Sequence, residues 1–91
     1  KKFKSPNDKE KIALKNLINK LETIDQSAKP EEIQTAIYTV GKENGYSTNL
    51  RDWFKLIYEV IFGELDGPRM GFFVSFFGIK ETINLINAKI K

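Results

Sequence analysis

Apolar residues recur along this chain at the three-to-four-residue spacing of helices that bury one face. In the first third of the sequence this stripe is formed by Leu14, Leu17, Ile18, Leu21 and Ile24. Side chains with that spacing lie on one side of an α-helix, and the charged residues between them lie mostly on the other. We therefore predict a first helix over about residues 6–24, with Ser5 as its N-cap and Pro6 at its first helical position.

A second and a third helix follow the same logic. We predict that the second begins at Pro30 and ends just before Gly45, which is placed to adopt a left-handed backbone conformation. Its apolar stripe is formed by Ile33, Ala36, Ile37 and Val40. The third is predicted to have Asn49 as its N-cap, supported by Asp52, and to end at Gly63. Its predicted buried face consists of Leu50, Trp53, Phe54, Ile57, Tyr58 and Ile61.

The stretch 50–77 holds most of the aromatic residues. Eight of the eleven in the sequence fall inside it: Trp53, Phe54, Tyr58, Phe62, Phe72, Phe73, Phe76 and Phe77. Aromatic side chains carry the largest apolar areas, so we expect the core to form here. A polar interruption at 63–69 divides the stretch. We expect the two apolar helices on either side of it to fold against each other, with the connecting loop held rigidly at one end.

The fourth helix is predicted to open at Pro68 and to close at Gly78. It is apolar nearly all round, which favours a central, buried position. A fifth helix is predicted from about Lys80, with a stripe formed by Ile79, Ile83, Ile86 and Ile90. Because no strand pattern competes, the sequence predicts an all-α fold, a bundle of about five helices in a single domain covering residues 1–91.

The amino-acid composition excludes several kinds of catalytic and metal-binding site. The chain has no Cys and no His, which excludes Ser-His-Asp and Cys-His catalysis, disulfides, and thiolate or imidazole metal ligands. The net charge of +3 is compatible with an anionic partner, and part of the excess comes from the two ends, at Lys1, Lys2, Lys4, Lys89 and Lys91. The longest apolar run is much shorter than the roughly 20 residues of a membrane helix. We expect no membrane partner and a cytoplasmic location.

The polar interruption is the first candidate site. A helix N-terminus offers unpaired N–H groups to an anion or to the acceptor edge of a base. Pro68 would fix the first turn, Gly67 would allow close approach, and Arg69 would add a planar fork of donors. The alternative is a tight helix-helix connection in which Arg69 pairs with Asp66 or Glu64, and composition and spacing alone favour this alternative.

The aromatic residues are the second candidate. Unstacked bases pack on exposed aromatic rings, yet an aromatic at helical spacing is more often part of a core. We assign Phe73 and Phe77 to the core, and favour the core for Trp53 and Phe54 as well. Tyr58 lies about one turn before the loop and its hydroxyl needs a partner, so a solvent-accessible position near the loop suits it. The carboxylates are expected to be solvated.

Five short strings carry a resemblance to a known family: Gly-Lys-Glu-Asn-Gly-Tyr (41–46), Asn-Leu-Arg-Asp-Trp-Phe-Lys (49–55), Tyr-Glu-Val-Ile-Phe-Gly (58–63), Gly-Pro-Arg-Met-Gly (67–71) and Phe-Gly-Ile (77–79). Together they resemble the C-terminal end of class I lysyl-tRNA synthetases. The specific match covers about residues 41–86, and residues 1–40 fit by helical pattern only. The C-terminal helical domain of glutamyl-tRNA synthetases is a weaker relative; the Trp53-Phe54 pair and Arg69 favour the lysyl family.

The resemblance implies an anticodon-binding domain of the helix-cage type, cut from a longer synthetase that charges tRNA with lysine using ATP and Mg²⁺. Its partners would be the tRNA anticodon loop and the remaining domains of the synthetase. Carried over from the family, the candidate RNA-binding residues are Tyr58, Asp66, Gly67, Pro68, Arg69 and Met70, with Arg51 and Lys55 as secondary phosphate contacts. Lysine anticodons are rich in uridine, so backbone N–H groups and Arg69 would meet uracil oxygens, and Met70 would pack against an unstacked base.

The same resemblance excludes catalysis by this chain alone. A class I active site needs a His-x-Gly-His signature and a Lys-Met-Ser-Lys-Ser element, and the sequence contains neither. We expect no cofactor in the chain itself. The alternative from another class of function is a helical protein-interaction module, which would dock a partner helix in a groove near Phe72 and Phe76.

Overall fold

The computed structural model describes residues 5–90. Of the lysines at the two ends of the chain, Lys1, Lys2, Lys4 and Lys91 lie outside the described residues. Five α-helices follow one another along the chain: α1 (Asp8–Glu22), α2 (Pro30–Gly41), α3 (Leu50–Phe62), α4 (Met70–Phe77) and α5 (Ile79–Ile90). A π-helical turn, η1 (Lys42–Tyr46), extends the end of α2. There is no strand between residues 5 and 90. The prediction of an all-α bundle of five helices is confirmed.

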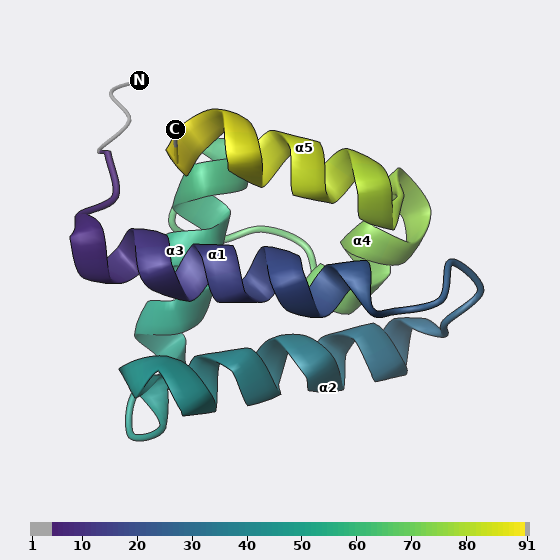
Figure 1. Cartoon of the computed structure of the whole chain (residues 1–91), viewed down its shortest axis with the longest axis horizontal. Coiled ribbons are helices and arrows are strands. Elements are labelled where there is room, and N and C mark those ends of the chain that lie inside the picture. The colour runs from purple at the N-terminus through teal and green to yellow at the C-terminus, as the bar shows by residue number, and fades with distance from the viewer. Residues whose placement is uncertain (1–4, 91) are drawn as a thin grey trace.

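Three of the helices form one layer, and α3 crosses behind this layer. In Figure 1, α5, α1 and α2 run roughly alongside one another, with α1 in the middle, and α3 passes behind this layer at a steep angle. The short α4 lies at the opposite end from η1, beside the start of α2. Because α2 meets α4 at one end and α3 at the other, it is the helix that positions both aromatic helices.

The core fills the space between this layer and α3. Its apolar members are contributed by all five helices: Ala13, Leu14, Leu17, Ile18, Leu21, Ile33, Ile37, Val40, Trp53, Leu56, Ile57, Val60, Met70, Val74 and Ile86. Trp53 is fully buried, and its indole N–H donates a hydrogen bond of 2.9 Å to the carbonyl of Ile37 in α2. A side chain at Gly41 would occupy the space taken by that indole, so the glycine is what lets α3 approach α2 so closely.

Several local sequence signals predict the helix boundaries correctly. Pro30 is the first residue of α2, and Gly45 adopts a positive φ of 97° in η1. The side chain of Asn49 caps α3 by accepting from the backbone N–H of Asp52. Gly63 ends the helix with a φ of 72°, a conformation that favours glycine. Each of these signals acts within a few residues along the chain, which is why each can be recognised in the sequence.

The start of α1 differs from the prediction. Its N-cap is Asn7 and not Ser5, so Pro6 precedes the helix instead of occupying its first position. Asn7 accepts from the N–H of Glu10 at 2.8 Å, and Glu10 accepts from the N–H of Asn7 at 2.9 Å. This reciprocal pair satisfies two backbone donors at once, an advantage that a serine at position 5 does not have.

The expectation that the helices on either side of the loop pack mainly on each other is wrong. α4 packs most extensively against α2, and α3 and α4 are joined by a ring contact between Phe62 and Phe73 at 4.9 Å. The expected burial of α4 on all sides is also wrong. Phe76 is 91% exposed and Phe77, which we assigned to the core, is 40% exposed.

Candidate nucleic-acid interface

The polar corner, defined here as residues 63–69, connects α3 to α4 at the molecular surface. The Tyr58 hydroxyl donates a hydrogen bond of 3.0 Å to the carbonyl of Pro68, which closes the corner back onto α3. Gly67 lies directly against the rings of Tyr58 and Phe62, so a Cβ there would approach both within 3.3 Å. Burial raises the pKa of Tyr58, and the negative charge of Asp66 raises it further. The expectation that Tyr58 lies near the loop and finds a hydroxyl partner is confirmed.

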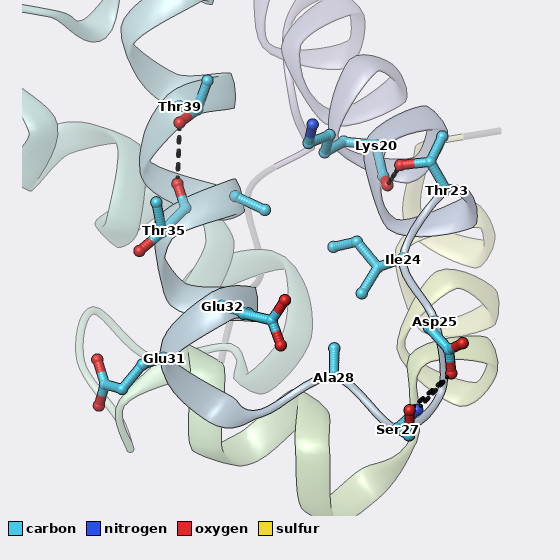
Figure 2. Close-up of a pocket in the computed structure, with 11 residues that line it drawn as sticks. Lys20, Thr23, Ile24, Asp25, Ser27, Ala28, Glu31, Glu32, Thr35 and Thr39 are labelled. Atoms are coloured by element: carbon cyan, nitrogen blue, oxygen red, sulfur yellow. Dashed lines mark hydrogen bonds between the residues drawn. The ribbon is translucent and has the colours of Figure 1, made fainter.

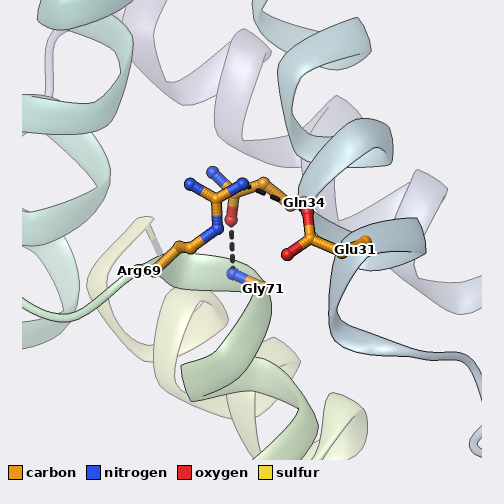
Figure 3. Close-up of polar contacts among 4 residues, drawn as sticks. All are labelled: Glu31, Gln34, Arg69 and Gly71. Carbon is orange, nitrogen blue, oxygen red and sulfur yellow. Dashed lines mark hydrogen bonds and ion pairs between the residues drawn. The ribbon is translucent and has the colours of Figure 1, made fainter.

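α4 begins at Met70 with Arg69 as its N-cap, so the prediction that Pro68 opens this helix is wrong. Arg69 stands at the end of the corner, with half of its side chain exposed. Its Nη2 lies 3.1 Å from Oε1 of Glu31, at the start of α2 (Figure 3). This partner is neither of the two carboxylates of the loop considered from the sequence. Glu31 is 38 residues away along the chain, and only the packing of α4 on α2 brings it within reach. The pair is exposed on both sides, so a competing anion would have access to the guanidinium.

The first turn of α4 is mostly turned inward. The backbone N–H of Gly71 donates a buried hydrogen bond of 2.6 Å to the side-chain oxygen of Gln34 in α2 (Figure 3). A Cβ at Gly71 would overlap the carbonyl of Pro30, so the two helices touch through their backbones at this point. This donor is therefore already used within the protein. Of the candidate residues, Met70 is placed in the core with 1% exposure, which leaves its side chain no surface to offer a base.

A surface hollow of about 370 Å³ lies between α3 and the corner. It is lined by Arg51, Phe54, Lys55, Tyr58, Leu65 and Asp66. Four of these six residues are among the site residues expected from the sequence. Arg51, Lys55 and Asp66 are exposed, and the Phe54 and Tyr58 rings are partly buried. The hollow thus combines two cations, a carboxylate and two aromatic rings in one place. The two lining residues that the sequence did not indicate are Leu65 and Phe54, and Phe54 also packs against the core, as predicted.

The rings of the hollow belong to a longer aromatic row. Consecutive ring centroids lie 4.9–6.5 Å apart through Tyr38, Phe54, Tyr58, Phe62, Phe73 and Phe77, from α2 across α3 to α4. Aromatic pairs at such distances attract one another beyond the effect of area alone. The row therefore packs α2, α3 and α4 together on the side of the corner.

A larger groove, of about 780 Å³, lies elsewhere, between the end of α1, the loop that follows it and α2 (Figure 2). Three carboxylates (Asp25, Glu31 and Glu32) and one cation (Lys20) line it. Hydrogen bonds from Ser27 lower the pKa of Asp25 and stabilise its charged form. A negatively charged groove repels phosphate, so the smaller hollow beside the corner is the better candidate for an anionic ligand despite its size.

Within residues 5–90, no group of three acidic side chains is arranged to hold a metal ion. No helix in the same range is long and apolar enough to cross a bilayer. The fold and the hollow together define a small all-α domain whose surface carries one hollow lined by two cations, a carboxylate and two aromatic rings.

Comparison with known proteins identifies the relatives of this domain. The chain is 40% identical over 90 residues to the lysine–tRNA ligase of Rickettsia felis, 39% identical to that of Rickettsia bellii, and 37% identical to that of Rickettsia akari. Each match covers 99% of this chain but only 17% of the relative. The chain is thus homologous, along nearly its whole length, to one segment of lysine–tRNA ligases. No family model and no solved structure matches it.

Proposed function

We propose that the chain is the C-terminal, anticodon-binding region of a class I lysine–tRNA ligase, and that the hollow beside the corner contacts unpaired nucleotides of the anticodon loop. The longer protein would act in the cytoplasm and join lysine to its tRNA using ATP and Mg²⁺. The homology to a segment of lysine–tRNA ligases supports this assignment. ATP and Mg²⁺ would be bound by other parts of that protein.

One observation carries the proposal: the fold gathers Arg51, Lys55, Tyr58 and Asp66 around a single hollow. These residues come from two segments, α3 and the corner, and they have complementary uses. The two exposed cations can neutralise phosphates, and the partly exposed ring of Phe54 offers a face on which a base can stack. The Asp66 carboxylate can accept a hydrogen bond from a base N–H, such as that of uracil.

Tyr58 has fewer groups free to bind a ligand than its hydroxyl suggests. Because that hydroxyl already donates to Pro68, it can offer a ligand only its ring and its oxygen lone pairs. Tyr58 would then act mainly by holding the corner, and Asp66 with it, at a fixed distance from α3. Arg69 lies at the far end of the corner and would add a phosphate contact in competition with Glu31.

In the complete ligase, such a domain would contribute specificity without touching the reacting atoms. Binding energy obtained at a remote site helps to commit the correct tRNA to the catalytic centre. The modest charge of this domain, +3 in total, favours weak binding by the domain alone.

A binding assay with the anticodon stem-loop of lysine tRNA tests the proposal. We expect the Arg51→Ala/Lys55→Ala double variant to weaken binding on the order of tenfold, and to reduce the slope of log K against log salt by about 2. The control is Lys15→Ala, which removes another exposed cation from α1, away from the hollow. Circular dichroism checks that each variant keeps its helices.

Equal losses for Lys15→Ala and for the variants of the hollow would mean that any surface cation serves, and the site would be rejected. Arg69→Ala belongs in the same assay and should weaken binding while leaving the helical fold intact. Unchanged affinity for this variant would remove Arg69 from the interface while leaving the hollow as the proposed site.

A further inference from the structure

The outer face of α4 holds three of the six large hydrophobic side chains that are exposed among the described residues. α4 contains no charged residue, although 30% of the sequence is charged. Phe76 is 91% exposed, Phe72 is 54% exposed, and Phe77 lies next to them with 40% exposure. We refer to these three phenylalanines as the α4 patch. Contiguous exposed aromatics of this kind mark interaction surfaces, because leaving them in water is costly.

The α4 patch is not a core face that failed to find its place in the fold. The opposite face of the same helix is already docked, with Met70, Gly71 and Val74 buried. The backbone contact of Gly71 with α2, and its hydrogen bond to Gln34, fix the orientation of the helix. The phenylalanines are therefore presented outward by a helix that cannot rotate to bury them.

The surroundings of the patch disfavour RNA as its occupant. Binding of single strands combines stacking with cations that track the phosphates. α4 itself carries no cation, and the two that flank it, Arg69 and Lys80, lie beyond its ends; Arg69 is also paired with Glu31. An apolar protein surface matches the α4 patch better than a polyanion does.

The size of the patch favours a tethered partner over a free one. A stable complex between separate proteins buries about 800 Å² on each side. Three phenylalanines offer at most about 150–250 Å² each, and these are already partly covered. A covalent connection raises the effective concentration of a neighbouring domain, so a small contact can then suffice. The relatives of this chain provide such a connection, since the matched segment is only 17% of each of them.

We propose that the α4 patch docks against another part of the same polypeptide in a lysine–tRNA ligase, and so fixes how this domain is held relative to the rest of the enzyme. The inference rests on the homology to lysine–tRNA ligases and not on RNA binding by the hollow. Loss of RNA binding in the hollow variants and loss of docking in the patch variants are therefore separate results.

A full-length chimera provides the test: the lysine–tRNA ligase of Rickettsia felis, with its matching 90 residues replaced by this chain. A photo-crosslinking residue, p-benzoylphenylalanine, takes the place of Phe76, and mass spectrometry maps its products. We expect cross-links within one molecule to residues outside the 91-residue segment. The same residue placed at Ile12, which is 62% exposed in α1, is the matched control and should give none.

A second measurement does not depend on the cross-linker. The double variant Phe72→Ser/Phe76→Ser should lower the melting temperature of the chimera by about 2–4 °C or more, and leave that of the 91-residue chain nearly unchanged. Cross-links only between two molecules would assign the patch to a second copy, and cross-links to tRNA would assign it to RNA. Either result would overturn the proposal, as would the absence of cross-links.

Discussion

The two aromatic helices, α3 and α4, differ in what they expose on their outer faces. α3 buries Trp53 and keeps charged side chains on its exposed face, among them Arg51 and Lys55. α4 buries Met70 and Val74, yet it exposes phenylalanine on the opposite face. An outer face with cations beside aromatics is suited to a solvated polyanion. An outer face with aromatics alone is suited to an apolar surface.

This difference shows that overall hydrophobicity does not decide which helix lies at the centre of a domain. The more apolar helix, α4, exposes three of its four phenylalanines, although Met70 and Val74 are buried and a glycine contact attaches the helix closely to α2. α3 is held by an indole that fills space in the core and reaches a backbone carbonyl. The attachment of each helix, and the corner that joins the two helices, can be tested by separate substitutions. They are given below from the largest expected loss of stability to the smallest.

The attachment of α3 gives the largest expected effect. Trp53→Ala removes the largest fully buried side chain and leaves a cavity beside Gly41, so we expect a loss of about 3–5 kcal/mol in the free energy of unfolding. Chemical denaturation followed by circular dichroism measures the loss, since the variant lacks the only tryptophan. Arg51→Ala, on the exposed face of the same helix, should change stability by less than about 0.5 kcal/mol. A loss below about 1 kcal/mol for Trp53→Ala would contradict the packing described here.

The attachment of α4 gives the second effect. In Gly71→Ala the new methyl group meets the carbonyl of Pro30, which belongs to the backbone and cannot move aside alone. We expect a loss of about 1–3 kcal/mol, reduced in part by the better helix propensity of alanine. Ser75→Ala, on the exposed face of α4, is the control and should be nearly neutral. Should Gly71→Ala stabilise the protein, the close contact between α2 and α4 would be disproved.

The same contrast explains what the sequence could and could not predict. Pro30, Asn49 and Gly63 act on their own helix ends, so their roles can be inferred from local pattern. The cap at Asn7 was also local, and its signal was the glutamate three residues later. The partners of α4 were not local, because Glu31 and Gln34 lie 37–38 residues from their contacts. No periodicity in α4 indicates which of its apolar faces α2 will cover.

For the candidate site, the sequence and the resemblance indicate which residues lie near one another, but not which of them are accessible to a ligand. Arg51, Lys55, Tyr58 and Asp66 do line one hollow, since each of the first three lies one helical turn from the next and the corner folds back beside them. Met70 was included because it adjoins the corner, yet the first turn of α4 faces α2 and buries it. Its burial follows from the α2–α4 contact, which the sequence did not reveal.

The corner that joins the two helices gives the smallest effect and the only one that depends on pH. Tyr58→Phe removes the hydrogen bond to Pro68, so we expect a loss of about 0.5–1.5 kcal/mol at pH 8. Because burial raises the pKa of Tyr58, the folded state keeps this proton at pH values where the unfolded state releases it. The stabilisation is therefore complete below the ordinary tyrosine pKa of about 10, and it is lost as pH rises through the higher pKa of the folded state.

Urea unfolding followed by Trp53 fluorescence, from pH 8 to pH 11, should show the difference between the wild type and Tyr58→Phe shrinking as pH rises. Tyr46→Phe is the comparison, because burial raises the pKa of Tyr46 too, while the Tyr58–Pro68 bond is kept. In Tyr46→Phe, Tyr58 is unchanged, so its hydrogen bond to Pro68 should be lost only when Tyr58 releases its proton at high pH. No difference between the wild type and Tyr58→Phe at pH 8 would mean that the hydroxyl does not hold the corner, and that Asp66 is positioned by the backbone of the loop alone. A difference that stays constant up to pH 11 would contradict the raised pKa of Tyr58.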